Sequence, residues 1–376
     1  MSSQSFFNQT NDTPSKKDGR LPMHANNGKD LDPELAVNTQ TAESLRDFAE
    51  ESSLGFQGLE SKAVFEQLER RYTHLLAALQ WFINQGRADD AFRLAASLAP
   101  FWIATKRLEE GTEWFDRAFA VPGRQDIHHG EALFQAGMLA FWQGNDDRAS
   151  MLHTRARDIG RQIGDATIIA KALSGLARIA LRSDVAEARR LCREALAVTE
   201  GTNDQRGRSN AMHVLGVAAQ MAGDFQEARQ LMSERIAQAR AIGNFLVISS
   251  EAGNLSMVER QLGNLNQAEL LAGEALEIDY QRGDHWAMPY KVSGLAAVST
   301  ERREYERAAT LVGVADAMME AEKAGWPPDE RPHYEWMVTT LKSAMGAIAF
   351  DQARATGYTM TISEAVDFAL RPHLDE

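Results

Sequence analysis

The histidines of this chain are the first residues to consider as metal ligands. The chain has nine of them, and His128 and His129 stand side by side in the stretch "GRQDIHHG". Adjacent residues on a connector cannot both direct their side chains at one ion unless further ligands converge on it. The His-Glu-x-x-His spacing of helical zinc sites does not occur. The sequence therefore predicts no metal site, and it indicates no other cofactor.

Carboxylate pairs and the single cysteine have structural explanations. Glu109-Glu110 and Asp146-Asp147 fall where helices are expected to begin, and negative charge there complements the helix dipole. Cys192 lies in "ARRLCREAL" at a position expected to face a neighbouring helix, so we interpret it as a core thiol. Neither a Gly-x-Ser-x-Gly nucleophile elbow nor a Gly-x-x-x-x-Gly-Lys-Ser/Thr phosphate loop occurs. The chain is predicted not to be an enzyme.

A helical periodicity positions these side chains. From Thr41 onward, apolar residues recur at the i, i+3, i+4 and i+7 spacing of an amphipathic helix, interrupted by Gly, Asn or Asp. No alternating strand pattern is found. The sequence therefore predicts an all-α protein. Residues 1–40 are polar and are expected to form a disordered leader.

A repeat of 39 or 40 residues underlies this periodicity. Each copy has an anchor alanine, a leucine three positions later and, in most copies, a glycine five positions earlier. Small residues let two antiparallel helices approach closely, and Gly followed by Asn or Asp ends the first helix and caps the second. Such pairs cannot bury their apolar faces alone, so we expect them to stack into a solenoid. The anchors are Ala149, Ala188, Ala228, Ala268 and Ala308, the leucines are Leu152, Leu191, Leu231, Leu271 and Leu311, and the turn positions are Gly144, Ser183, Gly223, Gly263 and Arg303.

One copy also carries a family resemblance. The stretch "GNLSMVERQLGNLNQAELLAGEALEI", residues 253–278, resembles a tetratricopeptide repeat of the longer type. Asn254-Leu255-Ser256 stands where that family has Asn-Leu-Gly, and Gly263-Asn264-Leu265 stands for its Gly-Asp-Tyr. Ala268 and Ala275-Leu276 match its two small-residue sites. The resemblance implies a right-handed α–α superhelix of helix pairs.

A second resemblance involves both ends of the chain. The block 61–121 is similar to the segment that follows the ATPase core in AfsR-like and LuxR/MalT-like bacterial regulators, which are signal-transduction ATPases with a helical repeat sensor. The C-terminal part is similar to their closing segment, so the likeness spans roughly residues 41–372 and implies signal sensing linked to transcriptional regulation. His74 departs from the family's usual Asn. The matching residues are Ala77-Ala78-Leu79, Trp81, Leu94-Ala95, Phe101-Trp102, Glu110-Gly111, Trp114-Phe115, Leu311–Ala315, Pro327-Pro328 and "TISEAVDFAL".

Two domains of those regulators are not found in this sequence. It has no Walker loop, and it leaves no room for a separate DNA-binding helix-turn-helix domain. The chain therefore corresponds to the sensor, as a free-standing product, a gene remnant or a fragment, and its starting Met and polar leader favour the first. We predict a leader at 1–40, a helical block at 41–121, repeats at 122–322 and capping helices at 323–376.

Residues on the first helix of each repeat are the candidate binding surface. If Gly137 takes the small site of its helix, neighbouring aromatic residues fall on inner-groove positions of tetratricopeptide repeats, and polar residues take these positions in later copies. An aromatic wall facing a polar rim suits a peptide or small ligand. The alternative is that the aromatic residues pack between repeats. The candidate groove residues are Phe134, Met138, Phe141, Trp142, Asn210, His213, Gln220, Met257, Arg260 and Tyr290.

The stretch "AGWPPDERPHYEW" interrupts the repeats, because its prolines break helicity. We expect its aromatic residues Trp326, Tyr334 and Trp336 to cover the end of the repeat stack, which would otherwise present an apolar face to water. A recognition loop is the alternative.

Charge and composition limit the classes of partner that the chain is expected to bind. A net charge of −13 argues against direct DNA binding, which depends on Lys and Arg neutralising phosphates. No apolar run is long enough for a membrane span, and a single cysteine fits the reducing cytoplasm. The leading interpretation is a module that binds a protein or peptide, with a small effector as a further option. The alternative is an assembly scaffold without a small-molecule site, and the oligomeric state is not indicated.

Overall fold

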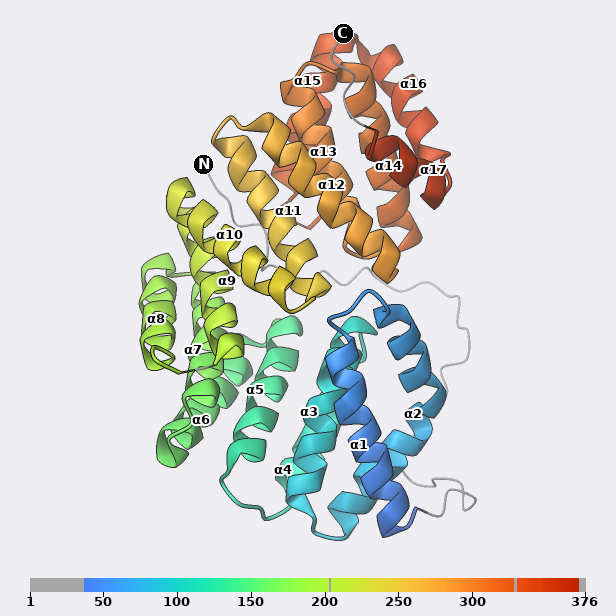
Figure 1. Ribbon diagram of the computed structural model, residues 1–376. Coiled ribbons are helices and arrows are strands. Elements are labelled where there is room, and N and C mark those ends of the chain that lie inside the picture. Colours follow the sequence, from blue (N-terminus) through green and yellow to red (C-terminus); the bar gives the residue numbers. More distant parts are fainter. Residues whose placement is uncertain (1–36, 203, 328–329, 372–376) are drawn as a thin grey trace. The chain divides into compact units, whose positions relative to one another are not determined.

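The computed structural model describes residues 37–202, 204–327 and 330–371, and these residues form helices without any strand (Figure 1). The prediction of an all-α fold is confirmed. The expected leader lies almost wholly outside the described residues, and the first helix begins at Thr39. The helices are α1 Thr39–Gly55, α2 Ser61–Asn84, α3 Ala88–Ala104, α4 Leu108–Phe119, α5 Ile127–Trp142, α6 Asp146–Ile163, α7 Ala166–Ala180, α8 Val185–Val198, α9 Gln205–Ala222, α10 Phe225–Ala241, α11 Phe245–Gln261, α12 Leu265–Arg282, α13 Met288–Glu301, α14 Tyr305–Ala321, α15 Arg331–Met345, α16 Ala347–Tyr358 and α17 Ile362–Ala369.

The helices fall into two compact units. The N-terminal unit contains the described residues up to Leu54 together with Phe65–Asp165. The C-terminal unit contains Gly55–Val64 and the chain from Ala166 onward. No described helix is long and apolar enough to cross a membrane.

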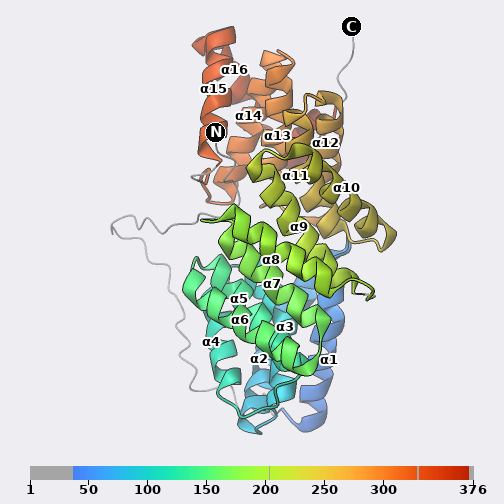
Figure 2. The ribbon, with the colours of Figure 1, turned by 90° about the vertical axis from the view of Figure 1, so that its left-hand side faces the viewer.

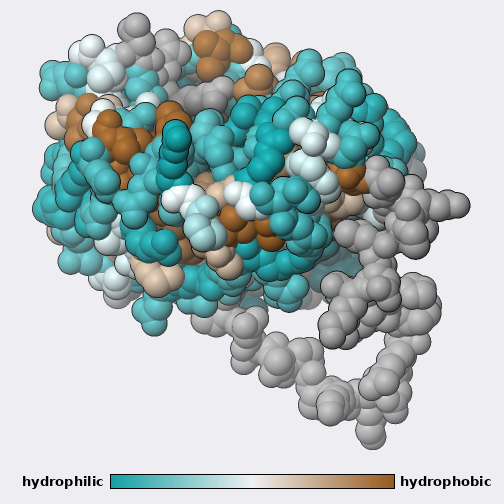
Figure 3. All heavy atoms as spheres, turned by 90° about the horizontal axis from the view of Figure 1, so that it is seen from below, coloured by the Kyte–Doolittle hydropathy of each residue, from teal (hydrophilic) through white to brown (hydrophobic). Residues whose placement is uncertain are grey.

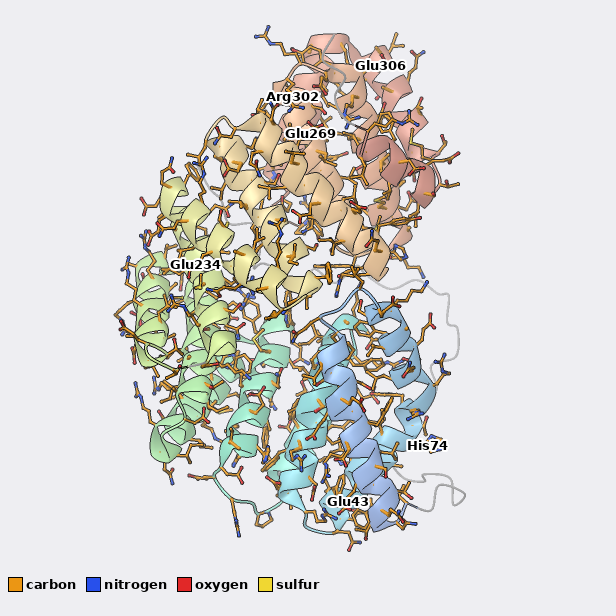
Figure 4. All side chains as sticks on the ribbon, in the orientation of Figure 1. Glu43, His74, Glu234, Glu269, Arg302 and Glu306 are labelled. Carbon is orange, nitrogen blue, oxygen red and sulfur yellow. The ribbon has the colours of Figure 1, made fainter. Side chains whose placement is uncertain are left out.

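The N-terminal unit has an aromatic core built around α3. Trp102 is fully buried and its indole Nε1 donates to the hydroxyl of Tyr72, 2.8 Å away. Arg93 of α3 binds both carboxylate oxygens of Glu50 on α1, at 2.7 and 2.8 Å. His74 lies exposed on α2 (Figure 4). The face seen in Figure 3 is mainly hydrophilic, with separate hydrophobic patches.

Helix hairpins α7–α8, α9–α10, α11–α12 and α13–α14 form the repeat array of the C-terminal unit (Figure 1 and Figure 2). The four predicted anchors in this array, Ala188, Ala228, Ala268 and Ala308, are completely buried. An alanine methyl is small enough to let the two helices of a hairpin approach closely. The anchors therefore lie in the interior, as the repeat spacing predicts.

The turns inside the hairpins follow the predicted chemistry in part. Gly144, Gly223 and Gly263 adopt a left-handed backbone with φ of 75°, 81° and 80°, as expected for residues that end a helix. Asn145 caps the helix that follows, because its side chain accepts from the backbone N–H of Arg148. Asn264 occupies the same place but instead donates to the carboxylate of Glu259, 2.7 Å away. The Gly-Asn dipeptide thus sets the turn in both hairpins. Whether its Asn side chain caps the second helix depends on the neighbouring side chains.

The odd-numbered helices form the inner layer of the array. Consecutive pairs α7–α9, α9–α11 and α11–α13 contact each other directly, whereas the second helices of the hairpins, α8, α10, α12 and α14, make no comparable contact with one another. In a curved stack, the elements on the inner side lie closer together than those on the outer side. The inner face is therefore built by α7, α9, α11 and α13.

The connection between α1 and α2 lies against the third hairpin of this array, α11–α12. The backbone carbonyl of Gln57 accepts from the N–H of Phe245, at 2.8 Å. Arg282 of α12 donates to the carbonyls of Gly58 and Phe56, at 2.6 and 3.1 Å. Backbone carbonyls thereby bind the two terminal nitrogens of a buried guanidinium, so the segment 55–64 helps to hold α11 and α12.

Helices beyond the repeats close the C-terminal unit. Helix α16 packs on α14 so closely that a β-carbon on Gly357 would overlap the carbonyl of Thr310, and one on Gly313 would overlap the carbonyl of Arg354. Helix α17 contacts α12 and α14. Its N-terminus carries a reciprocal cap between Thr361 and Glu364.

Substituting Gly357 by Ala should destabilise the protein by about 1–3 kcal/mol, because the added methyl must push two helix backbones apart. The measurement is urea unfolding followed by circular dichroism. Gly294→Ala in α13 is the matched control, since its β-carbon would meet only Ala272 at 3.9 Å. That control should be neutral or stabilise by about 0.5–1 kcal/mol through helix propensity. Equal losses in the two variants would contradict the close α14–α16 contact.

Candidate functional site on the inner layer

Six of the predicted groove residues lie on the inner layer of the C-terminal unit. Asn210, His213 and Gln220 are on α9, Met257 and Arg260 are on α11, and Tyr290 is on α13. Gln220 is nearly buried, and the other five are partly exposed. We refer to these six residues, together with Arg178 of α7, as the inner row.

The four predicted aromatic-wall residues, Phe134, Met138, Phe141 and Trp142, lie instead on α5 in the N-terminal unit. Phe134 and Phe141 are buried, and Met138 and Trp142 are partly exposed. Phe134 lies 5.5 Å from the ring of the buried His153, centroid to centroid. Because a buried ring offers little surface to a ligand, Phe134 and Phe141 have the environment of core residues.

A buried carboxylate, Glu251, organises the middle of the inner row. Its side chain is 0 % exposed, and it binds the imidazole Nδ1 of His213 and the guanidinium of Arg235 on α10. The Nε of Arg235 also donates to the carbonyl and hydroxyl oxygens of Ser209, at 2.9 and 3.0 Å. Three consecutive helices, α9, α10 and α11, thus meet at one charge, which we call the Glu251 centre.

The charged groups of the Glu251 centre shift one another's pKa. Burial by itself would raise the pKa of Glu251, but Arg235 and His213 bring this pKa below its ordinary value. Burial lowers the pKa of His213, and Arg235 and Arg178 act in the same direction although Glu251 opposes them. His213 is therefore neutral at neutral pH. Its Nδ1 carries the proton that Glu251 accepts, which leaves Nε2 as a hydrogen-bond acceptor.

Arg178 adds a second guanidinium to this region, and sequence analysis did not single it out. Among the described residues it makes no hydrogen bond and no ion pair. Burial lowers its pKa to about 10, and the like charge of Arg235 contributes to the shift. Arg178 therefore remains protonated at neutral pH. With two guanidiniums, one carboxylate and a neutral imidazole, the region has a net charge of one positive unit.

The other end of the inner row meets the segment that follows the repeats. Tyr290 lies edge-on to Trp326, with ring centroids 6.0 Å apart, and Trp326 stacks on Tyr334 at 5.1 Å. Arg260 lies 5.8 Å from the ring centroid of Trp336. The segment expected to cover the repeat stack therefore covers Tyr290 and approaches Arg260 on the inner side.

A cleft of about 830 Å³ lies next to this segment, between α14 and α16. Its wall is held by Asp316, which accepts from Tyr334 at 3.0 Å and from the Nε of Arg354 at 2.7 Å. Trp326 donates to the same carboxylate at 3.3 Å. Sequence analysis did not predict this cleft, because it forms between helices about 40 residues apart in the chain.

Catalytic or metal-binding chemistry finds little support in the described part of the chain. No group of three His, Cys, Asp or Glu side chains there could hold a metal ion. Cys192 is buried, and burial raises its pKa to about 12, which keeps the thiol protonated and unreactive. Other charges form ordinary ion pairs, such as Arg302 with Glu269 (Figure 4).

Replacing Glu251 by Gln should destabilise the protein by about 3–5 kcal/mol, because it leaves the buried guanidinium of Arg235 without its counter-charge. The control Glu274→Gln removes the partner of Arg240 in an exposed pair at 2.6 Å and should cost less than about 1 kcal/mol. Urea unfolding of both variants measures the difference. A loss for Glu251→Gln no larger than the control would show that the Glu251 centre does not hold the three helices together.

Acid should destabilise the protein through His333. Burial lowers the pKa of this histidine to about 4, and Arg260 adds to the effect. The unfolded chain takes up this proton near about pH 6.5, whereas the folded protein does not until about pH 4. The stability that the neutral His333 contributes is therefore fully present above the pKa of histidine in the unfolded chain. It is lost progressively as the pH falls below that value. His333→Gln should lose less stability than the wild type between about pH 7 and pH 5, measured by thermal unfolding; equal losses would contradict this assignment.

Comparisons with known proteins agree with this architecture. The family model described as tetratricopeptide repeat matches residues 169–241, which cover most of α7–α10. No curated protein sequence matches the chain.

Two solved structures are similar in fold. One is a signal transduction ATPase with numerous domains that carries a tetratricopeptide repeat sensor, from Pyrococcus horikoshii; identity is 11 %, the TM-score is 0.54, and the alignment covers 88 % of this chain and 54 % of that one. The other is a Rap protein complexed with competence and sporulation factor; identity is 13 %, the TM-score is 0.50, and coverage is 87 % of this chain and 96 % of that one.

A tetratricopeptide repeat protein from Parabacteroides merdae has 15 % identity and a TM-score of 0.46, over 81 % of this chain and 99 % of that one. The repeat spacing, the helix hairpins and the family match agree: residues 169–241 are tetratricopeptide repeats, set in a solenoid of the tetratricopeptide type.

Proposed function

We propose that this chain is a non-catalytic binding module whose inner row receives an extended segment of a partner protein or a peptide. The observation that carries the proposal is the line of partly exposed polar side chains on directly contacting helices, from Arg178 on α7 through Asn210 and His213 on α9 to Arg260 on α11. An extended segment has unpaired backbone N–H and C=O groups, which such side chains can bind at intervals.

The chemistry of individual positions supports this proposal. Asn210 carries both a donor and an acceptor, and the Nε2 atom of His213 is an acceptor held in place by the bond from Nδ1 to Glu251. Met257 is partly exposed on α11, three positions before Arg260, and offers an adaptable apolar contact. Side chains held by a buried network lose little freedom on binding, which favours affinity.

The similar proteins support a role in signal sensing. One is named as an ATPase with a tetratricopeptide repeat sensor, and the other was solved with competence and sporulation factor bound. The resemblance to AfsR-like and LuxR/MalT-like regulators points the same way. We therefore place the module in bacterial signal transduction linked to transcriptional regulation, in the cytoplasm.

An assembly scaffold is the second candidate, and one observation favours it. Leu270 on α12 is 68 % exposed on the outer layer, beside a small depression that Gln267 and Glu274 help to line. An exposed leucine of this kind can contribute to a protein–protein contact. In that case the partner would bind the outer layer and leave the inner row free.

A peptide selection distinguishes the two candidates. Peptides selected from a random library on the purified full chain are retested on Met257→Trp, which fills the inner row, and on Leu270→Trp, which adds the same bulk to the outer layer. The proposal predicts at least about tenfold weaker binding, equivalent to 1.4 kcal/mol, for Met257→Trp alone. Circular dichroism and the thermal midpoint confirm that both variants are folded.

Loss of binding only in Leu270→Trp would favour the scaffold and contradict the proposed site. A selection that yields no binding peptide would also contradict it.

A further inference from the structure

The segment 55–64, which we call the strap, is held on the third hairpin largely through its backbone. The carbonyl of Gln57 accepts from the N–H groups of Phe245 and Leu246, at 2.8 and 3.3 Å. These two residues begin α11, so their N–H groups have no partner within the helix. Water satisfies such groups as well as a carbonyl does. This contact can therefore open without leaving an unpaired polar group.

Leu59 is the apolar anchor of the strap. It packs against a small cluster of buried side chains, Ala239, Ile248 and Ile278, at one end of the third hairpin. Leu54, just before the strap, is 57 % exposed and is not part of this cluster. One leucine and a few backbone carbonyls thus carry much of the attachment.

The guanidinium of Arg282 has two partners within its reach. In this structure it donates to the strap, at the carbonyls of Phe56 and Gly58. Asp279 stands three positions earlier on α12 and so lies on the same face of the helix. Nevertheless, Nε of Arg282 and Oδ2 of Asp279 are both buried without a hydrogen-bond partner among the described residues. The other carboxylate oxygen accepts from the hydroxyl of Ser249.

This arrangement leaves two buried charges without a bond between them. Burial raises the pKa of Asp279 to about 6, although the charge of Lys291 and the bond from Ser249 act in the opposite direction. The carboxylate is therefore ionised at neutral pH. Burial also lowers the pKa of Arg282. Buried opposite charges stabilise a fold only where their hydrogen bonds are made, and here the strap's carbonyls take those of Arg282. The bound strap thus prevents an ion pair that α12 could form by itself.

We infer that the strap is a releasable element, and that Arg282 exchanges the strap's carbonyls for the carboxylate of Asp279 when the strap leaves the third hairpin. Release uncovers the first N–H groups of α11 and the apolar cluster beneath Leu59. The open surface recaptures the strap's own sequence, because it requires only backbone carbonyls and one leucine. The strap is thereby a switch that covers or exposes this end of the hairpin. The inference uses none of the residues of the inner row.

Hydrogen–deuterium exchange of the full chain reports on the strap, because the amides of Phe245 and Leu246 are protected only while it is bound. Leu59→Ala should raise their exchange at least about tenfold, since it removes the apolar anchor. Leu54→Ala is the matched control and should leave their exchange unchanged. Circular dichroism and the thermal midpoint show whether each variant is folded. If Leu59→Ala does not fold, Arg282→Met serves in its place, because it removes the donors to the strap and should raise the same exchange.

Recapture is tested with a labelled peptide of residues 54–62, "LGFQGLESK", blocked at both ends. Its binding to the full chain is followed by fluorescence anisotropy. The peptide should bind the Leu59→Ala chain at least about tenfold more tightly than the wild type, whose own strap competes for the surface. The same peptide with Leu59→Ala should not bind either chain.

Asp279→Asn distinguishes a switch from fixed packing. It takes away the alternative partner of Arg282, so the strap should be held more firmly and the exchange of Phe245 and Leu246 should fall below that of the wild type. A carboxylate that merely supports Arg282 in its present place would give the opposite change. Glu277→Gln, on the exposed side of α12, is the control and should leave the exchange unchanged.

Three results would overturn the inference. The first is a folded Leu59→Ala variant whose exchange at the start of α11 matches that of Leu54→Ala. The second is a strap peptide that binds this variant no better than it binds the wild type. The third is faster exchange in Asp279→Asn. Because none of these readouts involves the inner row, their failure would leave the proposed function standing.

Discussion

The close approach of the two helices in each hairpin is the constraint on which the rest of the structure depends. It is set by alanines that are completely buried at intervals of 39 or 40 residues. With the helices so close, each hairpin has an apolar face on either side, and neighbouring hairpins must cover it. This stacking brings the odd-numbered helices together as an inner layer, and it places side chains one repeat apart in contact.

The Glu251 centre is a direct consequence of that stacking. His213 and Glu251 are 38 residues apart in the chain, close to one repeat length, and they meet because α9 and α11 are adjacent. A charge placed between repeats must be paired where it lies, so the centre fixes α9, α10 and α11 relative to one another. It also holds His213 in one orientation. The part of the inner layer that is proposed to bind is therefore held in place by buried polar contacts.

Much of the fold could be predicted from the sequence because its causes are local. The spacing of Ala188, Ala228, Ala268 and Ala308 identified the hairpins, and Gly223 and Gly263 identified their turns. Contacts between residues far apart in the sequence could not be predicted. Nothing in the local pattern says that the carbonyl of Gly58 accepts from Arg282, or that Trp326 covers Tyr290.

The candidate site could be predicted only in outline. Counting along the repeat placed Asn210, His213 and Met257 on the inner layer, but a helical pattern cannot separate a core ring such as Phe134 from an accessible one. Arg178 left a signal that the search for known motifs passed over, namely an arginine where the other copies carry apolar side chains. A departure from the repeat's own pattern is therefore as informative as the pattern itself.

The central claim is that ligands bind to the inner layer of the C-terminal unit. Photo-crosslinking tests it most directly: a peptide selected on the full chain is given a photoreactive residue, irradiated in the complex, and the attachment points are mapped by mass spectrometry. The account predicts attachment to α7, α9 and α11. Attachment to α10 and α12, on the outer layer, would contradict it.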